Sequence, residues 1–299
     1  MTRKKLCCVI PVGPNQVDNA NLFASITSGN SHESDFILVL DGTSDLISKE
    51  LQEFSSRHSN VKLIYSSARN PGGARNLGMI EADSDWLVFF DADDSFNSIE
   101  ILKGLEEATD ESEAIIFGFT IDGKSTGESI IHRAQPTNNS KERLRNSLIH
   151  YPGIWRWAFR SDSLSESKFL ELKMGEDIVF LINFLKIERR IQYSSRVSYN
   201  YNFSLPTQLT KSLAAKQDLL LAFKAAVDVV STSNVKIENK AVIGLTSLLL
   251  YSALRHLRLT NRLRLVGSVL AYGIKSWSNF KLLMSLLIER PRAKYGKKQ

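Results

Sequence analysis

The ten residues WLVFFDADDS, at positions 86–95, decide the fold that we expect from this sequence. Five apolar residues in a row are typical of a strand that is buried on both faces, as strands in parallel sheets are. The strand ends in Asp91, Asp93 and Asp94, so it brings three carboxylates to one edge of the sheet. Ligands of open α/β sheets bind at this edge, outside the carboxyl ends of the strands.

Three carboxylates within four residues repel one another and are costly to hold together unless a cation neutralises them. Mg²⁺ and Mn²⁺ take oxygen ligands and are commonly shared between one or two carboxylates and substrate phosphates. We therefore expect Asp91 and Asp93 to bind a metal ion together with a diphosphate. A plain acidic turn is the alternative, and in either case we expect Asp94 or Ser95 to cap the helix that follows.

Apolar runs and segments of helical length alternate through the first 120 residues. Short apolar runs, most of which end in Gly or Asp, occupy residues 6–13, 36–42, 61–66, 86–91 and 114–123. Segments of helical length lie between them, at residues 19–28, 44–57, 73–82 and 98–109. This alternation predicts βαβ units, wound right-handed into a layered α/β domain with a parallel sheet.

A second polar segment, NPGGARNLGM, occupies residues 70–79. Two glycines at the start of a helix allow backbone N–H groups to approach a phosphate, and the helix dipole favours an anion there. Arg75 is suited to add a charge-assisted hydrogen bond to the same anion. The plain alternative is a turn in which Asn70 caps the helix and Arg75 is solvated.

Two further acidic positions are candidates. Asp41, in VLDG at a strand end, is suited to accept a hydrogen bond from a nucleobase N–H or a ribose hydroxyl, or else forms a turn with Gly42. Glu176 and Asp177 follow Gly175 at a helix start. A carboxylate there serves as a general base if it faces the site, or simply complements the helix dipole.

The rest of the chain divides into a polar stretch and a largely helical region. Residues 124–139 are expected to be a loop, 140–150 a helix, 151–162 an aromatic-rich strand, 174–187 a helix and 189–203 a strand. Helices are expected beyond residue 213, which gives a domain at 1–212 and a helical accessory region at 213–299. On the aromatic strand, Trp155 and Trp157 share one face, and we consider them as a stacking surface for an acceptor sugar or as core residues.

Composition excludes several classes of protein. With 299 residues, 43% apolar and 23% charged, the chain is neither disordered nor of low complexity. The only cysteines, Cys7 and Cys8, are adjacent and cannot form an ordinary structural disulfide, which favours a reducing compartment. The apolar stretch at the N-terminus is too short for a signal peptide, so we expect a cytoplasmic protein. The five histidines show no ligand spacing, and no zinc site is expected.

The net charge of +6 is concentrated at one end. Residues 255–299 hold 11 Lys and Arg against a single acid, Glu289. Because these cations lie among long apolar runs, residues 241–299 favour a peripheral contact with a membrane surface, or self-association, over nucleic acid. A solvated helix face remains an equally valid reading.

Taken in order, these segments resemble glycosyltransferase family 2, whose members have the GT-A fold, a mixed and mainly parallel sheet flanked by helices. The resemblance covers residues 5–211. It is carried by Val9–Val12 on the first strand, Asp41–Gly42, Ala74–Gly78 on a helix, Asp91–Asp94, and Glu176–Asp177 on a later helix.

The resemblance implies a sugar-nucleotide donor, UDP before other nucleotides, and a site shared among several strand ends. Pro11 and Asp41 would line the nucleobase pocket, with Arg75 and Asn76 in the donor site near the diphosphate or base. Asp91 would reach the ribose and Asp93 would bind Mn²⁺ or Mg²⁺. The remaining pair would serve catalysis, Asp177 as base with Glu176 beside it.

The activity expected from this resemblance is an inverting hexosyl transfer to a hydroxyl group of a glycan or lipid-linked acceptor. Assembly of bacterial surface polysaccharides at the inner face of the cell membrane fits that chemistry. Three other functions compete with it. A metal-dependent phosphatase has a similar strand-end motif after its first strand, a nucleotidyltransferase needs a glycine-rich N-terminal loop that contains arginine, and an inactive scaffold would keep the fold alone.

Overall fold

The computed structural model forms two compact units that are interleaved along the chain. It describes residues 4–16, 18–29, 32–122, 129–132, 144, 147–202, 215–233, 235 and 239–256, with single positions at 262, 266, 267, 281 and 284. The first unit, here called the sheet unit, comprises Met1–Pro136, Ile154–Glu171 and Arg189–Gln208. The second, here called the helical unit, comprises Thr137–Gly153, Leu172–Glu188 and Leu209–Gln299.

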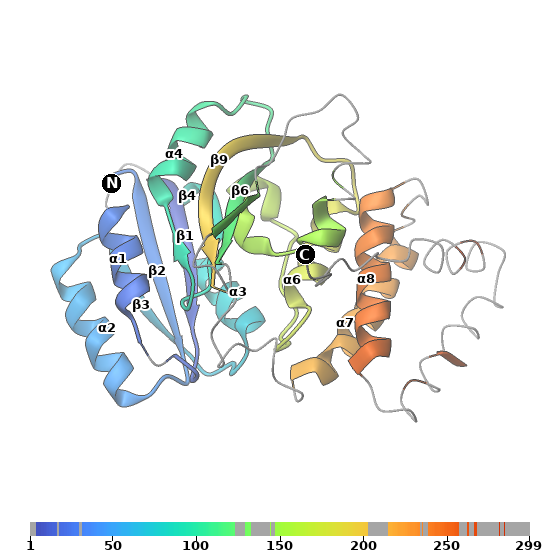
Figure 1. Ribbon diagram of the computed structural model, residues 1–299, viewed down its shortest axis with the longest axis horizontal. Coiled ribbons are helices and arrows are strands. Elements are labelled where there is room, and N and C mark those ends of the chain that lie inside the picture. Colours follow the sequence, from blue (N-terminus) through green and yellow to red (C-terminus); the bar gives the residue numbers. More distant parts are fainter. Residues whose placement is uncertain are drawn as a thin grey trace. The chain divides into compact units, whose positions relative to one another are not determined.

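The sheet unit follows the predicted alternation of strands and helices (Figure 1). Its first part contains β1 (Lys4–Val12), α1 (Ala20–Ser28), β2 (Ser34–Asp41), α2 (Asp45–Arg57), β3 (Val61–Ser66), α3 (Pro71–Glu81) and β4 (Ser84–Phe89). Its second part contains β5 (Ser95–Phe96), α4 (Ser98–Glu106), β6 (Ala114–Asp122), β7 (Ser129–His132), η1 (Ile154–Arg156), β8 (Trp157–Arg160), η2 (Ser161–Leu164) and β9 (Ile191–Tyr201).

The strands form one mixed sheet in the order β3-β2-β1-β4-β8-β6-β9-β5, with β7 paired to β6. The pairs β3–β2, β2–β1, β1–β4 and β6–β9 are parallel, and β8 joins β4 to β6 in antiparallel pairing. The carboxyl ends of β1 to β4 therefore meet at one edge, as the sequence predicted. This confirms the expected mixed, mainly parallel sheet flanked by helices.

The core of the sheet unit follows from the continuous apolar runs. Every residue of β1 from Leu6 to Ile10 is at most 1% exposed, so both faces of the strand are covered. Helix α3 packs on β1, β2 and β3, and Gly78 makes this approach possible. A Cβ atom at Gly78 would lie 2.3 Å from the Cγ1 methyl of Val9, a distance that no side chain tolerates.

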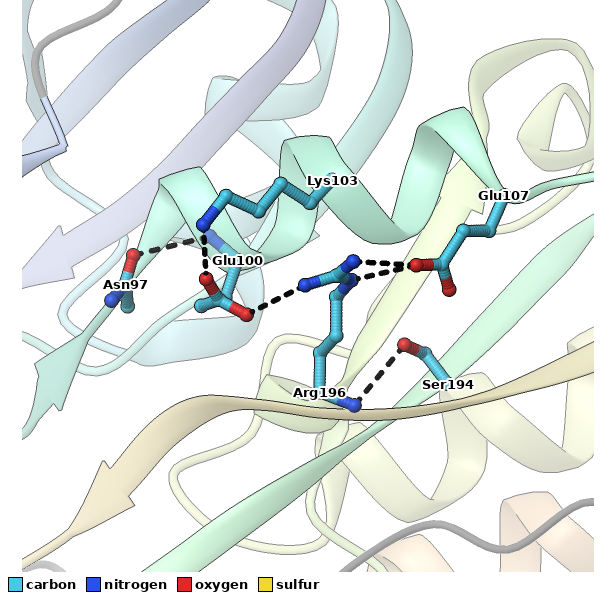
Figure 2. Close-up of polar contacts among 6 residues, drawn as sticks. All are labelled: Asn97, Glu100, Lys103, Glu107, Ser194 and Arg196. Carbon is cyan, nitrogen blue, oxygen red and sulfur yellow. Dashed lines mark hydrogen bonds and ion pairs between the residues drawn. The ribbon is translucent and has the colours of Figure 1, made fainter.

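Helix α4 begins after Asn97, whose Oδ1 atom accepts the backbone N–H of Glu100 at 3.1 Å. The expectation that Asp94 or Ser95 caps this helix is therefore wrong, because the short strand β5 lies between the acidic run and the cap. Ion pairs then fasten α4 to β9 (Figure 2). Arg196 of β9 donates to Glu100 at 3.1 Å and to Glu107 at 2.6 Å.

Two stretches differ from the expected secondary structure. The predicted loop at 124–139 contains β7, which continues the sheet by antiparallel pairing with β6. The predicted aromatic strand at 151–162 divides into the 3-10 turn η1, the four-residue strand β8 and η2. Short elements of this kind carry little periodicity, so their type depends on the partners that they find in the sheet.

The helical unit contains α6 (Glu176–Leu185), η4 (Ala215–Gln217), α7 (Asp218–Thr232) and α8 (Lys240–His256). The three helices contact one another, and α7 and α8 lie side by side (Figure 1). The expected domain boundary after residue 212 falls among residues 203–214, which are outside the described part of the chain, as is most of the basic region after His256. Among the described residues, no helix has both the length and the apolar character needed to span a bilayer.

Candidate active site

The carboxyl end of β2 carries Asp41, which is only 4% exposed. Its Oδ1 atom accepts the backbone N–H of Arg69 at 2.8 Å. Arg69 has a φ angle of 55°, a left-handed conformation that is unusual for a residue with a side chain. Pro11 lies nearby on β1, where it is in register with Val39 of β2. Asp41 thus shapes the β3–α3 loop and has a second oxygen for further hydrogen bonds.

Arg75 of α3 and Asp91, two residues beyond β4, form an ion pair. The guanidinium donates to Asp91 Oδ1 at 2.7 Å, and the side chains are 5% and 36% exposed. The guanidinium also lies 5.5 Å from the centre of the Phe169 ring. Arg75 is therefore buried and paired, which excludes the alternative in which it is solvated.

The amino end of α3 is closed by protein groups. Asn70 caps it, with Oδ1 accepting the Gly73 N–H at 2.7 Å. A Cβ atom at Gly72 would lie 1.8 Å from the Leu170 carbonyl oxygen, so this glycine admits a neighbouring backbone segment. Asn76 fixes the same segment, because its amide both donates to and accepts from the Phe169 main chain at 2.8 Å. The glycines that suggested a phosphate cradle thus serve close packing of the chain on itself.

The acidic run after β4 is a tight turn in which the Asp94 N–H donates to the Asp91 carbonyl at 3.3 Å. Burial, followed by the charge of Asp91, raises the pKa of Asp93 to about 6. Burial, followed by the charges of Asp93 and Asp91, raises the pKa of Asp94 to about 8. Burial and mutual repulsion thus disfavour the ionised forms of both carboxyl groups, and a nearby cation would offset this cost.

The described part of the chain contributes few metal ligands at any one place. Among the residues that the structure describes, no group of three or more His, Cys, Asp or Glu side chains is arranged to hold a metal ion. A site that shares its ion with substrate phosphates needs only one or two carboxylates, so Asp91 and Asp93 fit that kind of site.

Asp94 is the most buried member of the run, at 1% exposure. The Tyr199 hydroxyl donates to its Oδ2 atom at 2.5 Å, and the Asn202 backbone N–H donates to its Oδ1 atom at 2.7 Å. Strand β5 extends this attachment, since Ser95 and Phe96 pair with Asn200 and Tyr199 of β9. The acidic turn is therefore anchored to the carboxyl end of β9.

The two candidate acceptor tryptophans have different environments. Trp155, in η1, is partly exposed, and its ring stacks on Tyr199 with centroids 4.6 Å apart and on Tyr201 at 5.9 Å. Trp157, in β8, is 1% exposed and stacks on Phe159 at 5.5 Å. Trp157 is thus a core residue with no ring face open to a sugar. The expected shared face is absent because Trp155 precedes the strand.

Glu176 and Asp177 occupy the first turn of α6, in the helical unit. Glu176 is 6% exposed and Asp177 is partly exposed. Gly175, just before them, has a φ angle of 86°, and a Cβ atom there would lie 2.8 Å from the Ala222 Cβ atom of α7. The helix start is therefore fixed by α7. The placement of Asp177 opposite Asp93 stays a prediction.

Two partners of the site were not assigned from the sequence. Phe169 lies in a segment without regular structure, and nothing in its surroundings indicated that it would contact Arg75 and Asn76. Tyr199 belongs to the aromatic strand that the sequence did predict, but a contact with Asp94 across 105 residues carries no local signal.

Comparison with known proteins agrees with this fold and with the order of the motifs. Residues 20–167, about half of the chain, match the model of glycosyl transferase family 2. The chain is 23% identical over 206 residues to a poly(ribitol-phosphate) beta-glucosyltransferase of Bacillus spizizenii, covering 66% of this chain and 32% of that protein. The part of the chain that aligns covers 54% and 32% of the length of the first two curated relatives.

Solved structures of low identity share the fold. The structure of S. aureus TarS 1-349 in complex with UDP-GlcNAc aligns with a TM-score of 0.69 at 16% identity, covering 95% of this chain and 88% of that one. A mannosyltransferase of Pyrobaculum calidifontis in complex with GDP-Man and Mn²⁺ aligns with a TM-score of 0.52 at 13% identity, covering 98% and 88%. Phosphatases and nucleotidyltransferases are not favoured by these matches. Through residues 20–167, the chain belongs to glycosyl transferase family 2, and it has the fold of GT-A glycosyltransferases.

Proposed function

We propose that this chain transfers a hexosyl group from a nucleotide-sugar donor, in the first instance a UDP-sugar, to a hydroxyl group of an acceptor, with inversion at the anomeric carbon. The observation that carries the proposal is the Arg75–Asp91 ion pair beside Asp93 at the carboxyl edge of the sheet, in a chain of glycosyl transferase family 2. Ligands of open α/β sheets bind at this edge.

The donor nucleotide binds along the ends of β1, β2 and β4 in this proposal. Asp41 keeps one carboxylate oxygen for a nucleobase N–H while the other holds the Arg69 backbone, and Pro11 lies beside it on β1. Asp91, oriented by Arg75, accepts a hydrogen bond from the ribose. Arg75 and Asn76 support the donor site indirectly. Arg75 orients Asp91, and Asn76 fixes the backbone of Phe169.

Asp93, with Asp91, is the proposed ligand of Mn²⁺ or Mg²⁺. The raised pKa of Asp93 supports this assignment, because a buried carboxylate beside another one is stabilised by a cation. The Pyrobaculum calidifontis mannosyltransferase, similar in fold, was solved with Mn²⁺. When bound, the ion stabilises the negative charge that develops on the departing nucleoside diphosphate.

Asp177 is the proposed general base, with Glu176 beside it. An acceptor hydroxyl is a poor nucleophile, and a positioned carboxylate that removes its proton in the transition state makes it a better one. A single in-line displacement at the anomeric carbon then inverts its configuration, and no second nucleophilic carboxylate is required. The closed packing around Gly175 supports this role because it fixes the start of α6.

The proposed acceptor is a glycan or a lipid-linked glycan of a bacterial surface polysaccharide, and Trp155 is the side chain suited to stack on its sugar. A relative from Bacillus spizizenii is named a poly(ribitol-phosphate) beta-glucosyltransferase, which supports a surface-polymer acceptor. Cys7 and Cys8 are buried free thiols, as in a reducing compartment. We place the protein in the cytoplasm, where the basic residues after Arg255 would contact the inner face of the membrane.

The test is a panel of UDP-, GDP- and dTDP-sugars with Mn²⁺. We expect one sugar nucleotide to raise the melting temperature by several degrees, since a ligand that binds only the folded state stabilises it. Asp93→Asn should abolish this shift, and Asp177→Asn should keep it while transfer to acceptor is lost. Absence of any shift with every donor would refute the proposed function, and a shift without transfer by the unaltered protein would indicate a binding scaffold.

The membrane contact has a separate test. Deletion of residues 260–299 should lower co-sedimentation with vesicles that contain anionic lipid, because basic residues near an anionic surface each contribute about 1 kcal/mol to binding. Unchanged co-sedimentation together with an altered oligomer size would favour self-association in its place.

A further inference from the structure

Asp94 is a buried acidic residue that the proposed mechanism does not use. It lies between the proposed metal ligand Asp93 and strand β5, and it is 1% exposed. A carboxylate at this depth is costly unless its oxygens accept hydrogen bonds. Each of its two oxygens accepts one, from the Tyr199 hydroxyl at 2.5 Å and from the Asn202 backbone at 2.7 Å.

Both donors come from the end of β9, more than 100 residues further along the chain. They therefore tie the acidic turn to a distant strand at one point. Strand β5 adds the pairs Ser95 to Asn200 and Phe96 to Tyr199, so the turn is held from its carboxyl side as well. A small displacement of this attachment would move Asp93, which is the adjacent residue.

The Tyr199 ring is itself fixed. It is 2% exposed and stacks on Phe90 at 5.5 Å and on Trp155 at 4.6 Å between ring centroids. Burial, followed by the charge of Asp94, raises the pKa of the phenol well above its ordinary value, so the hydroxyl stays protonated and remains a donor. The hydroxyl thus points at Asp94 from a ring that has no room to turn away.

We propose that Asp94 is a positioning residue, which together with Tyr199 holds the Asp93 carboxylate in the geometry that binds a divalent cation and keeps it fixed relative to the Trp155 ring. The proposal rests on the proposed function, since it assigns to Asp93 the role of metal ligand. Loss of a group that hydrogen-bonds a metal ligand directly typically weakens metal binding by roughly 10- to 100-fold. Because Asp94 and Tyr199 act on Asp93 through the backbone of the turn, we expect an effect at the lower end of this range.

The test compares Tyr199→Phe, which removes a single hydroxyl and preserves the ring stack, with Asp94→Asn and the double variant. Ser84→Ala is the matched control, because Ser84 is 1% exposed and donates to the Trp86 carbonyl at 2.8 Å, but lies at the opposite end of β4. Titration calorimetry at saturating UDP measures the Mn²⁺ concentration that half-saturates the complex of protein and UDP. The melting temperature without ligands is recorded for each variant.

We expect Tyr199→Phe and Asp94→Asn each to raise the half-saturating Mn²⁺ concentration by roughly tenfold, and the double variant to be little worse than either, as for two members of one interaction. The control should lower the melting temperature to a similar degree and leave the Mn²⁺ dependence within about twofold. Tyr199→Phe decides the matter if Asp94→Asn does not fold.

An unchanged Mn²⁺ dependence in Tyr199→Phe, with a parent protein that binds UDP and Mn²⁺, would overturn this inference and leave the proposed function standing. Equal weakening in Ser84→Ala would also overturn it, because general destabilisation would then explain the effect. A parent protein that binds no nucleotide with Mn²⁺ would refute the proposed function, and the inference with it.

Discussion

Replacement of Arg75 by methionine tests the ion pair on which the proposed donor site depends. Methionine fills much of the same volume and keeps the apolar contact with Phe169, but it removes the charge beside Asp91. Breaking a fully buried pair by removal of one partner costs about 3–5 kcal/mol, and breaking an exposed pair costs about 0.2–1 kcal/mol. Asp91 is 36% exposed and its charge is partly solvated, so we expect a loss of about 2 kcal/mol.

The reciprocal variant, Asp91→Asn, should cost more. Arg75 is only 5% exposed, so loss of the carboxylate charge leaves a positive charge that is buried and poorly solvated. In Arg75→Met, by contrast, the remaining charge of Asp91 is partly solvated because Asp91 is 36% exposed. We expect about 3 kcal/mol for this change. The double variant should then be less destabilised than the sum of the two, by about 1–2 kcal/mol, because both charges are removed together.

The free energy of unfolding is measured by urea denaturation and monitored by tryptophan fluorescence. This signal reports on the sheet unit, because Trp86, Trp155 and Trp157 all belong to it. Titration with UDP and Mn²⁺ gives the functional consequence, and Arg75→Met should weaken UDP binding by roughly tenfold because Asp91 loses its orientation. A coupling energy below about 0.5 kcal/mol would refute the reasoning. Arg75 would then be held by its packing on Phe169 rather than by charge.

Three further changes have definite expected outcomes. The pKa is raised in the folded state to about 6 for Asp93 and to about 8 for Asp94. The contribution of these groups to stability is therefore present below about pH 4 and is lost as the pH rises through those two values. The melting temperature of the metal-free protein should fall over this range, and Mn²⁺ with UDP should oppose the fall. A flat profile in a metal-free scan would contradict this. Gly78→Ala should destabilise the sheet unit by about 1–3 kcal/mol in urea unfolding, despite the helix propensity of alanine, because the new methyl overlaps a buried valine of β1. Gly175→Ala should cost about 2–4 kcal/mol, from its positive φ and from contact with Ala222, and should lower kcat more than it changes the donor KM.

Much of the fold was predictable because its signals are local. The run 86–90 is buried throughout, as are residues 6–10 of β1 and 36–41 of β2, so apolar continuity alone located these parallel strands. Asn70, which caps α3, was also readable from its neighbours. Strands β5, β7 and β8, with two to four residues each, were missed or misjudged because pairing in the sheet decides them.

The functional residues were predictable as a set of residue types, but their partners were not. The acidic run after β4 indicated a charged site. The partner of Asp94, Tyr199, lies 105 residues away in the sequence, and the partner of Asn76, Phe169, lies 93 residues away. Arg75 pairs with Asp91, a partner that the sequence did not indicate, and its expected place near the diphosphate or base stays a prediction. Trp157 was considered for the acceptor and lies in the core on β8, whereas Trp155 belongs to the turn η1 before that strand, so the two rings do not share a strand face.

The pairing of Arg75 changes the electrostatic argument for a cation. An unpaired Arg75 on α3 would offset part of the charge of a diphosphate and so lessen the need for an ion. In the structure, the guanidinium is buried against Asp91, while burial and mutual repulsion raise the pKa of Asp93 and of Asp94 and so disfavour their ionised forms, which a cation would stabilise. A nucleoside diphosphate brought to this edge adds more charge of the same sign. If the donor binds at this edge as proposed, we expect a divalent cation to be what makes its binding favourable, and the affinity for UDP should then depend steeply on the Mn²⁺ concentration.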